Sequence, residues 1–68
     1  MWVLDSTRLE NERRRQEMSV QQLAAAVGVE LWQLRIILDS DGQGLDPSIV
    51  VNLASALGVQ PIDISRER

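Results

Sequence analysis

The sequence predicts an all-α fold of four or five short helices. Helix-start signals and glycine stops alternate along the chain, apolar residues between them recur at helical spacing, and no stretch shows the alternation of a half-buried strand. The 68 residues suffice for one domain, spanning 1–68. Folding so short a chain buries only about 60% of its unfolded surface, and two Trp are the whole aromatic content. We therefore expect a small core of aliphatic residues and Ala.

The first helix is expected from Thr7 to about Glu17. Thr7 and Glu10 have the spacing of a capping box, in which the Thr hydroxyl accepts an early amide and the Glu side chain reaches back. Leu9 is the only aliphatic residue inside this segment. We expect residues 2–4 to fold back and cover what the helix leaves open.

A glycine turn joins the second and third helices. Ser19 and Gln22 form a second capping box, and Gly28 ends the helix because a left-handed residue at that place is normally Gly. The third helix is expected from about Glu30 to Leu38, packed inward through Leu34 and Ile37. In the second helix, three apolar residues share one side: Leu23, Ala24 and Val27.

The fourth helix follows a loop rich in Asp and Gly, residues 39–46. Asp46 and Pro47 are an N-cap followed by proline at the first helical position, and Gly58 ends the helix. We expect a short helix or extended tail from Pro61, with Ile62 or Ile64 in the core. The buried side of the fourth helix is predicted to hold Ile49, Val50, Leu53, Ala54 and Leu57.

Inward packing of Leu34 and Ile37 turns Trp32 and Ile36 to the opposite side of the third helix, with Leu31 beside them. Adjacent exposed apolar side chains indicate a contact site, and Trp is a favoured anchor of protein interfaces. In the alternative interpretation, Leu31 is half-buried and Trp32 folds over a neighbouring helix.

Composition argues against several functional classes. The chain has no Cys and no His, so the usual general base and the usual zinc ligands are missing, and we expect no enzyme, metal or cofactor. Residues 39–50 begin like a calcium loop, with Asp39, Asp41, Gln43 and Gly44 in place, but Val50 stands where a bidentate carboxylate is needed. No apolar run spans a bilayer and no signal peptide is evident, so we expect a cytoplasmic protein without a membrane or small-molecule partner.

The charge balance is acidic. Seven Arg face ten acidic residues, for a net charge of −3. Nucleic-acid binders usually have a basic face, and here only the first helix shows one, at Arg13, Arg14 and Arg15, among glutamates. This run is either a solvated helix face or a binding patch, and both interpretations stay open.

The order and spacing of these helices resemble a known family. Ala24, Gly28, Val29, Leu34 and Ile37 fall where the lambda-repressor and Cro-like (XRE-type) family has the core of its helix-turn-helix, and the closing Ala-Leu-Gly-Val of the fourth helix, 56–59, is similar too. The resemblance covers about residues 7–64. It implies a compact lambda-repressor-like DNA-binding domain whose second and third helices form the helix-turn-helix.

The resemblance also implies where double-stranded DNA would be met: at 19–21, at 30–33, at Arg35 and Ile36, and at the loop from Asp39. Gln33 suits an adenine edge, Arg35 suits guanine, and Arg13–Arg15 suit the phosphate backbone. The predicted DNA-binding residues are Gln21, Gln22, Leu31, Trp32, Gln33, Arg35 and Ile36.

Several positions depart from the family pattern. Val20 replaces a common phosphate-binding Gln, Glu30 replaces a Ser at the tip of the recognition helix, and the following loop is acidic instead of basic. Two hypotheses follow. The first is sequence-specific DNA binding in transcriptional regulation, with a possible homodimer. The alternative is a protein–protein interaction module that keeps the fold, has lost DNA and binds its partner through Leu31, Trp32 and Ile36.

Overall fold

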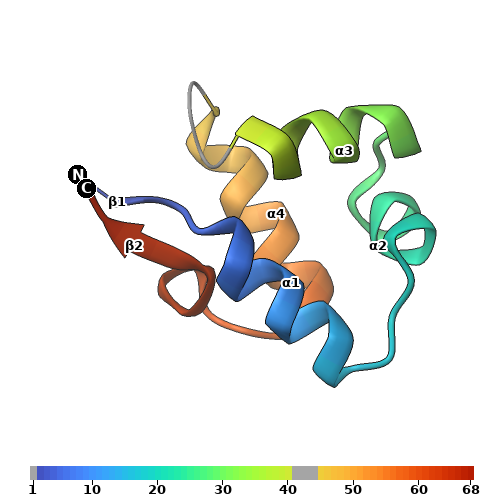
Figure 1. Ribbon diagram of the computed structural model, residues 1–68, viewed down its shortest axis with the longest axis horizontal. Coiled ribbons are helices and arrows are strands. Elements are labelled where there is room, and N and C mark those ends of the chain that lie inside the picture. Colours follow the sequence, from blue (N-terminus) through green and yellow to red (C-terminus); the bar gives the residue numbers. More distant parts are fainter. Residues whose placement is uncertain (1, 41–44) are drawn as a thin grey trace.

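The computed structural model describes residues 2–40 and 45–68 and is mostly helical, as predicted (Figure 1). Four α-helices and a short 3-10 helix are flanked by two short strands in the described part. In chain order, the elements are β1 (Trp2–Leu4), α1 (Ser6–Arg15), α2 (Val20–Val27), α3 (Leu31–Ser40), α4 (Pro47–Leu57), η1 (Pro61–Ile64) and β2 (Ser65–Glu67). No helix among these residues has the length and apolar character needed to cross a membrane.

The start of α1 corrects the predicted capping box. Asp5 is the N-cap, and its Oδ1 accepts from the amides of Thr7 and Arg8 at 2.9 and 3.2 Å. The helix therefore begins at Ser6 and ends at Arg15, before the predicted Glu17. Asp prevails because its carboxylate accepts two amide protons at once and carries the charge that a helix N-terminus favours.

Three helices end in the same way: the amide of a left-handed residue and the amide of the residue after it both donate to carbonyls of the last turn. The predicted stops at Gly28 and Gly58 are confirmed, with φ of 84° and 68°. Glu17 takes this position after α1 with φ of 55°, a conformation that costs a residue with a Cβ atom. The paired bonds run from Glu17 and Met18 to Arg14 and Arg13, from Gly28 and Val29 to Ala25 and Ala24, and from Gly58 and Val59 to Ser55 and Ala54.

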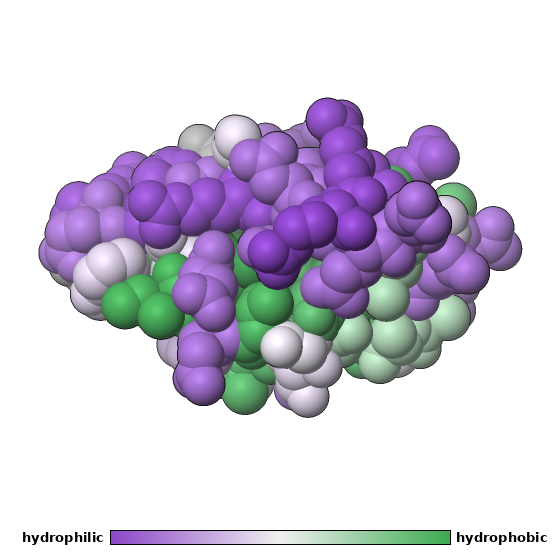
Figure 2. All heavy atoms as spheres, turned by 90° about the horizontal axis from the view of Figure 1, so that it is seen from below, coloured by the Kyte–Doolittle hydropathy of each residue, from purple (hydrophilic) through white to green (hydrophobic). Residues whose placement is uncertain are grey.

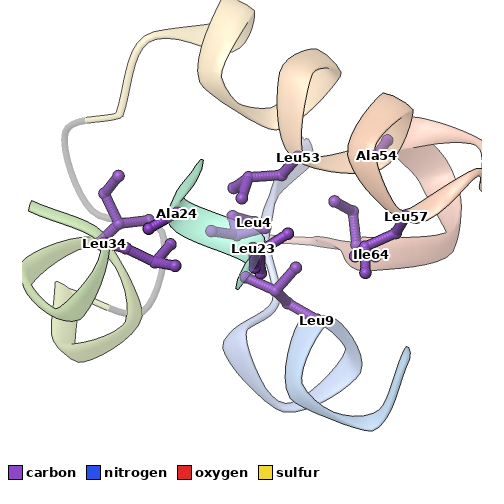
Figure 3. Close-up of a cluster of buried hydrophobic side chains, with 10 residues drawn as sticks. Leu4, Leu9, Leu23, Ala24, Leu34, Leu53, Ala54, Leu57 and Ile64 are labelled. Carbon is purple, nitrogen blue, oxygen red and sulfur yellow. The ribbon is translucent and has the colours of Figure 1, made fainter. Parts of the chain in front are cut away.

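The core lies around α2, which packs against both α3 and α4 (Figures 1 and 3). Ile64 of η1 is fully buried, whereas Ile62 is 56% exposed, which resolves the choice left open for the C-terminal segment. Every predicted helix contributes, and so does Leu4 of β1. The buried apolar side chains are Leu4, Leu9, Leu23, Ala24, Leu34, Ile37, Leu53, Ala54, Leu57 and Ile64.

The prediction that no strand occurs is wrong. β1 and β2 form an antiparallel pair that joins the two ends of the described chain, with Val3 opposite Arg66 (Figure 1). Leu4, the last residue of β1, is buried opposite Ser65, and the amide of Asp5 donates to the carbonyl of Ile64 at 2.8 Å. Three-residue strands are too short to show an alternating pattern. Because β1 and β2 lie at opposite ends of the sequence, no local pattern predicts their pairing.

Candidate interaction surface on the third helix

Contacts on the inner side of α3 fix its orientation. Leu34 and Ile37 are buried, as predicted, and α3 packs against α2 across the turn at Gly28. At the far end, the hydroxyl of Ser6 donates to the carbonyl of Leu38 at 2.9 Å and ties α3 to the start of α1. The helix is therefore held at both ends, and its rotation about its own axis is determined.

The outer side of α3 exposes two large apolar residues. Trp32 and Ile36 are 61% and 59% exposed, so the predicted orientation of this helix is confirmed. They lie one turn apart and adjoin on the helix surface. Leu31 is half-buried, as in the alternative interpretation, but the exposure of Trp32 shows that its indole is not packed over a neighbouring helix. We call Trp32, Gln33, Arg35, Ile36 and Asp39 the outer face of α3; all five are exposed.

The charged side chains on α3 and directly before it have no partners among the described residues. Glu30, Arg35 and Asp39 are exposed, and among the described residues none of the three forms an ion pair or a side-chain hydrogen bond. Arg35 and Asp39 have helical i,i+4 spacing, but with the base on the N-terminal side, which is the weaker order for such a pair. An arginine head group and two carboxylates are thus available to a ligand.

Two predicted DNA contacts have part of their side chain already engaged. Gln33 Oε1 accepts from the Glu30 amide at 2.8 Å, at the beginning of α3. Gln22 Oε1 accepts from the Ser19 amide at 2.8 Å, which confirms the second predicted capping box. Each oxygen keeps one lone pair, but the bond to the backbone fixes the orientation of the amide group, and bidentate recognition of adenine needs both the oxygen and the amide protons aimed at the base. Gln21, next to Gln22 at the start of α2, is exposed.

The arginines of α1 are held by contacts within the molecule. Arg13 is 15% exposed in its side chain; it donates to Glu10 through Nε at 3.0 Å and to the Met18 carbonyl through Nη1 at 2.7 Å. Arg14 lies 3.9 Å from Glu10, and Arg15 pairs with Glu12. Figure 2, seen from the side where α1 ends, shows hydrophilic side chains in a broad band beside a smaller apolar area. The three arginines thus share the two carboxylates of Glu10 and Glu12, and Arg13 also ties α1 to the segment that follows it through the Met18 carbonyl.

Sequence reasoning missed the C-terminal part of this surface. The prediction ended the third helix at Leu38 and assigned Asp39 to a loop, whereas α3 continues through Ser40. Asp39 therefore belongs to the outer face of α3, and Ser40, half-buried, donates its hydroxyl proton to the Ile37 carbonyl at 2.7 Å. The recurrence of Trp32, Ile36 and Asp39 at intervals of four and three is the signal that could have extended the helix.

The remaining loop predictions fall largely outside the described residues. Asp41, Gln43 and Gly44, named for the calcium-like loop, lie in the segment 41–44 that the structure does not describe. Within residues 2–40 and 45–68, no three acidic side chains are grouped so that they could hold a metal ion.

Comparisons of the chain with protein-family models, with curated proteins and with solved structures gave no match.

Proposed function

We propose that the chain is a helix-turn-helix domain that binds double-stranded DNA, with α3 as its recognition helix, and that it acts in transcriptional regulation. The observation that carries this proposal is Arg35, which is the only arginine on the described helices without an acidic partner and lies on a helix whose outer side is exposed. An exposed helix that follows a short turn after another helix is the element that such domains insert into the major groove.

Each exposed group has a role in this arrangement. Arg35 would donate to the O6 and N7 atoms of guanine, and Trp32 or Ile36 would pack on a thymine methyl group. Gln33 would contribute an amide proton to a base edge, since its oxygen is held by the Glu30 amide. Gln21 and Gln22, at the start of α2, would donate to a phosphate near the positive end of that helix.

The local charge predicts weak and salt-sensitive binding. Glu30 lies just before α3 and Asp39 lies near its end, so a carboxylate flanks the recognition surface on each side. Neutralisation of phosphates by Lys and Arg supplies most of the non-specific affinity of DNA-binding proteins. We expect detectable binding at low salt and its loss near physiological salt.

A salt series with a labelled mixed-sequence duplex tests the proposal. Fluorescence anisotropy should show binding at low salt that weakens as salt rises, and Arg35→Ala should lower the affinity by about tenfold, as expected for one base or phosphate contact. Arg14→Ala is the matched control, because it removes the same charge from α1, where Arg14 lies beside Glu10, and it should change binding far less. A wild-type domain that binds no duplex at low salt would remove the proposal.

A protein-docking role for the same surface is the second candidate. It is favoured by the 61% and 59% exposure of Trp32 and Ile36, since a pair of large apolar side chains is a typical interface anchor. The unpaired acids Glu30 and Asp39 would then repel nucleic acid and frame the contact. Trp32→Ala should abolish association with the partner, whereas Trp2→Ala, which removes an indole of similar exposure from β1, should not.

A further inference from the structure

The charges on the outer face of α3 are complementary to those on a second copy of the same face that runs in the opposite direction. Taking about 100° per residue, Trp32 and Ile36 form a central stripe, and Arg35 and Asp39 lie together on one of its flanks. The flank thus carries a positive charge and, one turn later, a negative charge, and neither has a partner within residues 2–40 and 45–68 of its own chain. A surface of this kind is complementary to a second copy of itself turned end over end.

We propose that the partner of this surface is a second copy of the chain, bound through an antiparallel, twofold-symmetric α3–α3 contact. Symmetry requires that a residue facing another across the axis is faced by it in return. With the axis at the level of Ile37, Arg35 of each copy lies opposite Asp39 of the other, because these residues are two positions on either side of it. Both unpaired charges are thereby paired, twice in one dimer.

The apolar stripe fits the same arrangement. Ile36 lies one position from the axis, so the two Ile36 side chains meet at the centre of the contact and lose their exposure to water. Trp32 lies five positions from the axis, just beyond the level of Ser40 in the second copy, so its indole lies at the edge of the contact. Ile36, Arg35 and Asp39 are thus covered together, with Ile36 at the desolvated centre and Trp32 at the rim.

The size of the contact predicts its strength. A ten-residue helix is about 15 Å long, so an interface made by α3 alone is at the small end of specific protein contacts. The dimer is therefore weak and depends on protein concentration. It also covers Arg35, so self-association and DNA binding exclude each other on this helix.

Charge reversal tests the reciprocal pairing. In sedimentation equilibrium over a concentration series, the wild-type domain should pass from one to two chains. Arg35→Asp and Asp39→Arg should each raise the dissociation constant by about tenfold or more, since each places like charges opposite one another. The double variant, with both changes, should return to within about threefold of the wild type, because it restores two opposite-charge pairs.

Two controls keep the result specific to α3. Arg14→Asp makes the same change of charge on α1 and should leave dimerisation unaltered. In a Trp2→Phe background Trp32 is the only indole, and its emission should shift to shorter wavelength as the dimer forms. A domain that stays monomeric at high concentration, single variants that still dimerise, or a double variant without recovery would each overturn the proposal.

This inference specifies the partner in the protein-docking role and does not depend on DNA binding. The same set of variants can disprove the dimer without disproving DNA binding, and the reverse. Asp39→Arg should weaken the dimer while strengthening binding to duplex, because it adds a positive charge at the end of the recognition helix. If duplex binding is absent in every variant but the charge-reversal pattern holds, the dimer stands and DNA binding fails.

Discussion

α1 and α3 have the same length, ten residues each, but their polar side chains are used in opposite ways. The arginines of α1 are paired with acidic neighbours, and two of them also donate to backbone carbonyls: Arg8 to Ser65 at 2.7 Å and Arg13 to Met18 at 2.7 Å. The charges of α3 have no partner among the described residues. The number of arginines on a helix is therefore a poor guide to binding, because an unpaired Arg35 is freer to contact a ligand than three arginines that already contact acidic neighbours.

The largest expected effects are losses of stability from substitutions on the buried sides of α1 and α3. On these sides the two helices do not differ. Leu9 and Leu34 are each 0% exposed, so Leu9→Ala and Leu34→Ala should each lower the free energy of unfolding by about 2–5 kcal/mol. That is a large part of the roughly 3–10 kcal/mol expected for a chain of 68 residues. Chemical denaturation followed by circular dichroism measures both changes.

Trp32→Ala is the matched substitution on the outer side of α3. It should change the free energy of unfolding by less than about 0.5 kcal/mol, because the indole is largely exposed. A loss comparable to that of Leu34→Ala would show that the indole supports the core, and the outer face of α3 would then be wrongly identified.

The buried residues of α2, α3 and α4 could be predicted from the sequence because their signals are local. Leu34 and Ile37 follow from helical spacing, and Gly28 and Gly58 follow from the left-handed conformation that ends a helix. The exposure of Trp32 could then be predicted too, because the buried side of a helix determines which residues lie on its exposed side. These inferences need only a few neighbouring residues.

The features that could not be predicted from the sequence depend on which of several possible hydrogen-bond partners is used in the folded chain. Thr7 and Asp5 both suit an N-cap, and only the folded chain shows that Asp5 takes it. The oxygen of Gln33 suits a base edge but accepts from the Glu30 amide. The pairing of β1 with β2 joins residues more than sixty positions apart, which no local pattern could indicate.

A smaller change in the free energy of unfolding should distinguish an arginine of α1 from the arginine of α3. Arg13→Ala should lower the free energy of unfolding by about 1–2 kcal/mol, because it removes charge-assisted hydrogen bonds to Glu10 and to the Met18 carbonyl in a half-buried setting. Arg35→Ala should leave it unchanged within about 0.5 kcal/mol. Thermal unfolding of the two variants compares them directly, and equal losses would contradict the division between a structural and a free arginine.

The end of α1 offers a smaller change of opposite sign. Glu17→Gly should raise the free energy of unfolding by up to about 1 kcal/mol, because glycine adopts the φ of 55° without the strain of a Cβ atom. Gly28→Ala should lower it by a similar amount at the end of α2; a Cβ there has open space, so the loss comes from backbone strain alone. If Glu17→Gly destabilises the domain, a side-chain contribution of Glu17 must outweigh that strain.

The smallest expected effect is the pH dependence of the stability that the N-cap Asp46 gives to α4. Unlike the exposed carboxylates on the outer side of α3, this carboxylate is hydrogen-bonded. The Asp46 carboxylate accepts from the Ser48 amide at 2.9 Å, and these hydrogen bonds with Ser48 lower its pKa from the usual 3.8. The cap therefore stabilises the fold fully above about pH 4, and the contribution is lost as the pH falls through the lowered pKa of the folded state. Asp46→Asn should remove this part of the acid dependence, whereas Ser19→Ala, which deletes an uncharged cap, should lower stability about equally at every pH. Melting temperatures between pH 2 and pH 6 measure the difference, and identical acid profiles for wild type and Asp46→Asn would mean that the cap does not couple protonation to folding.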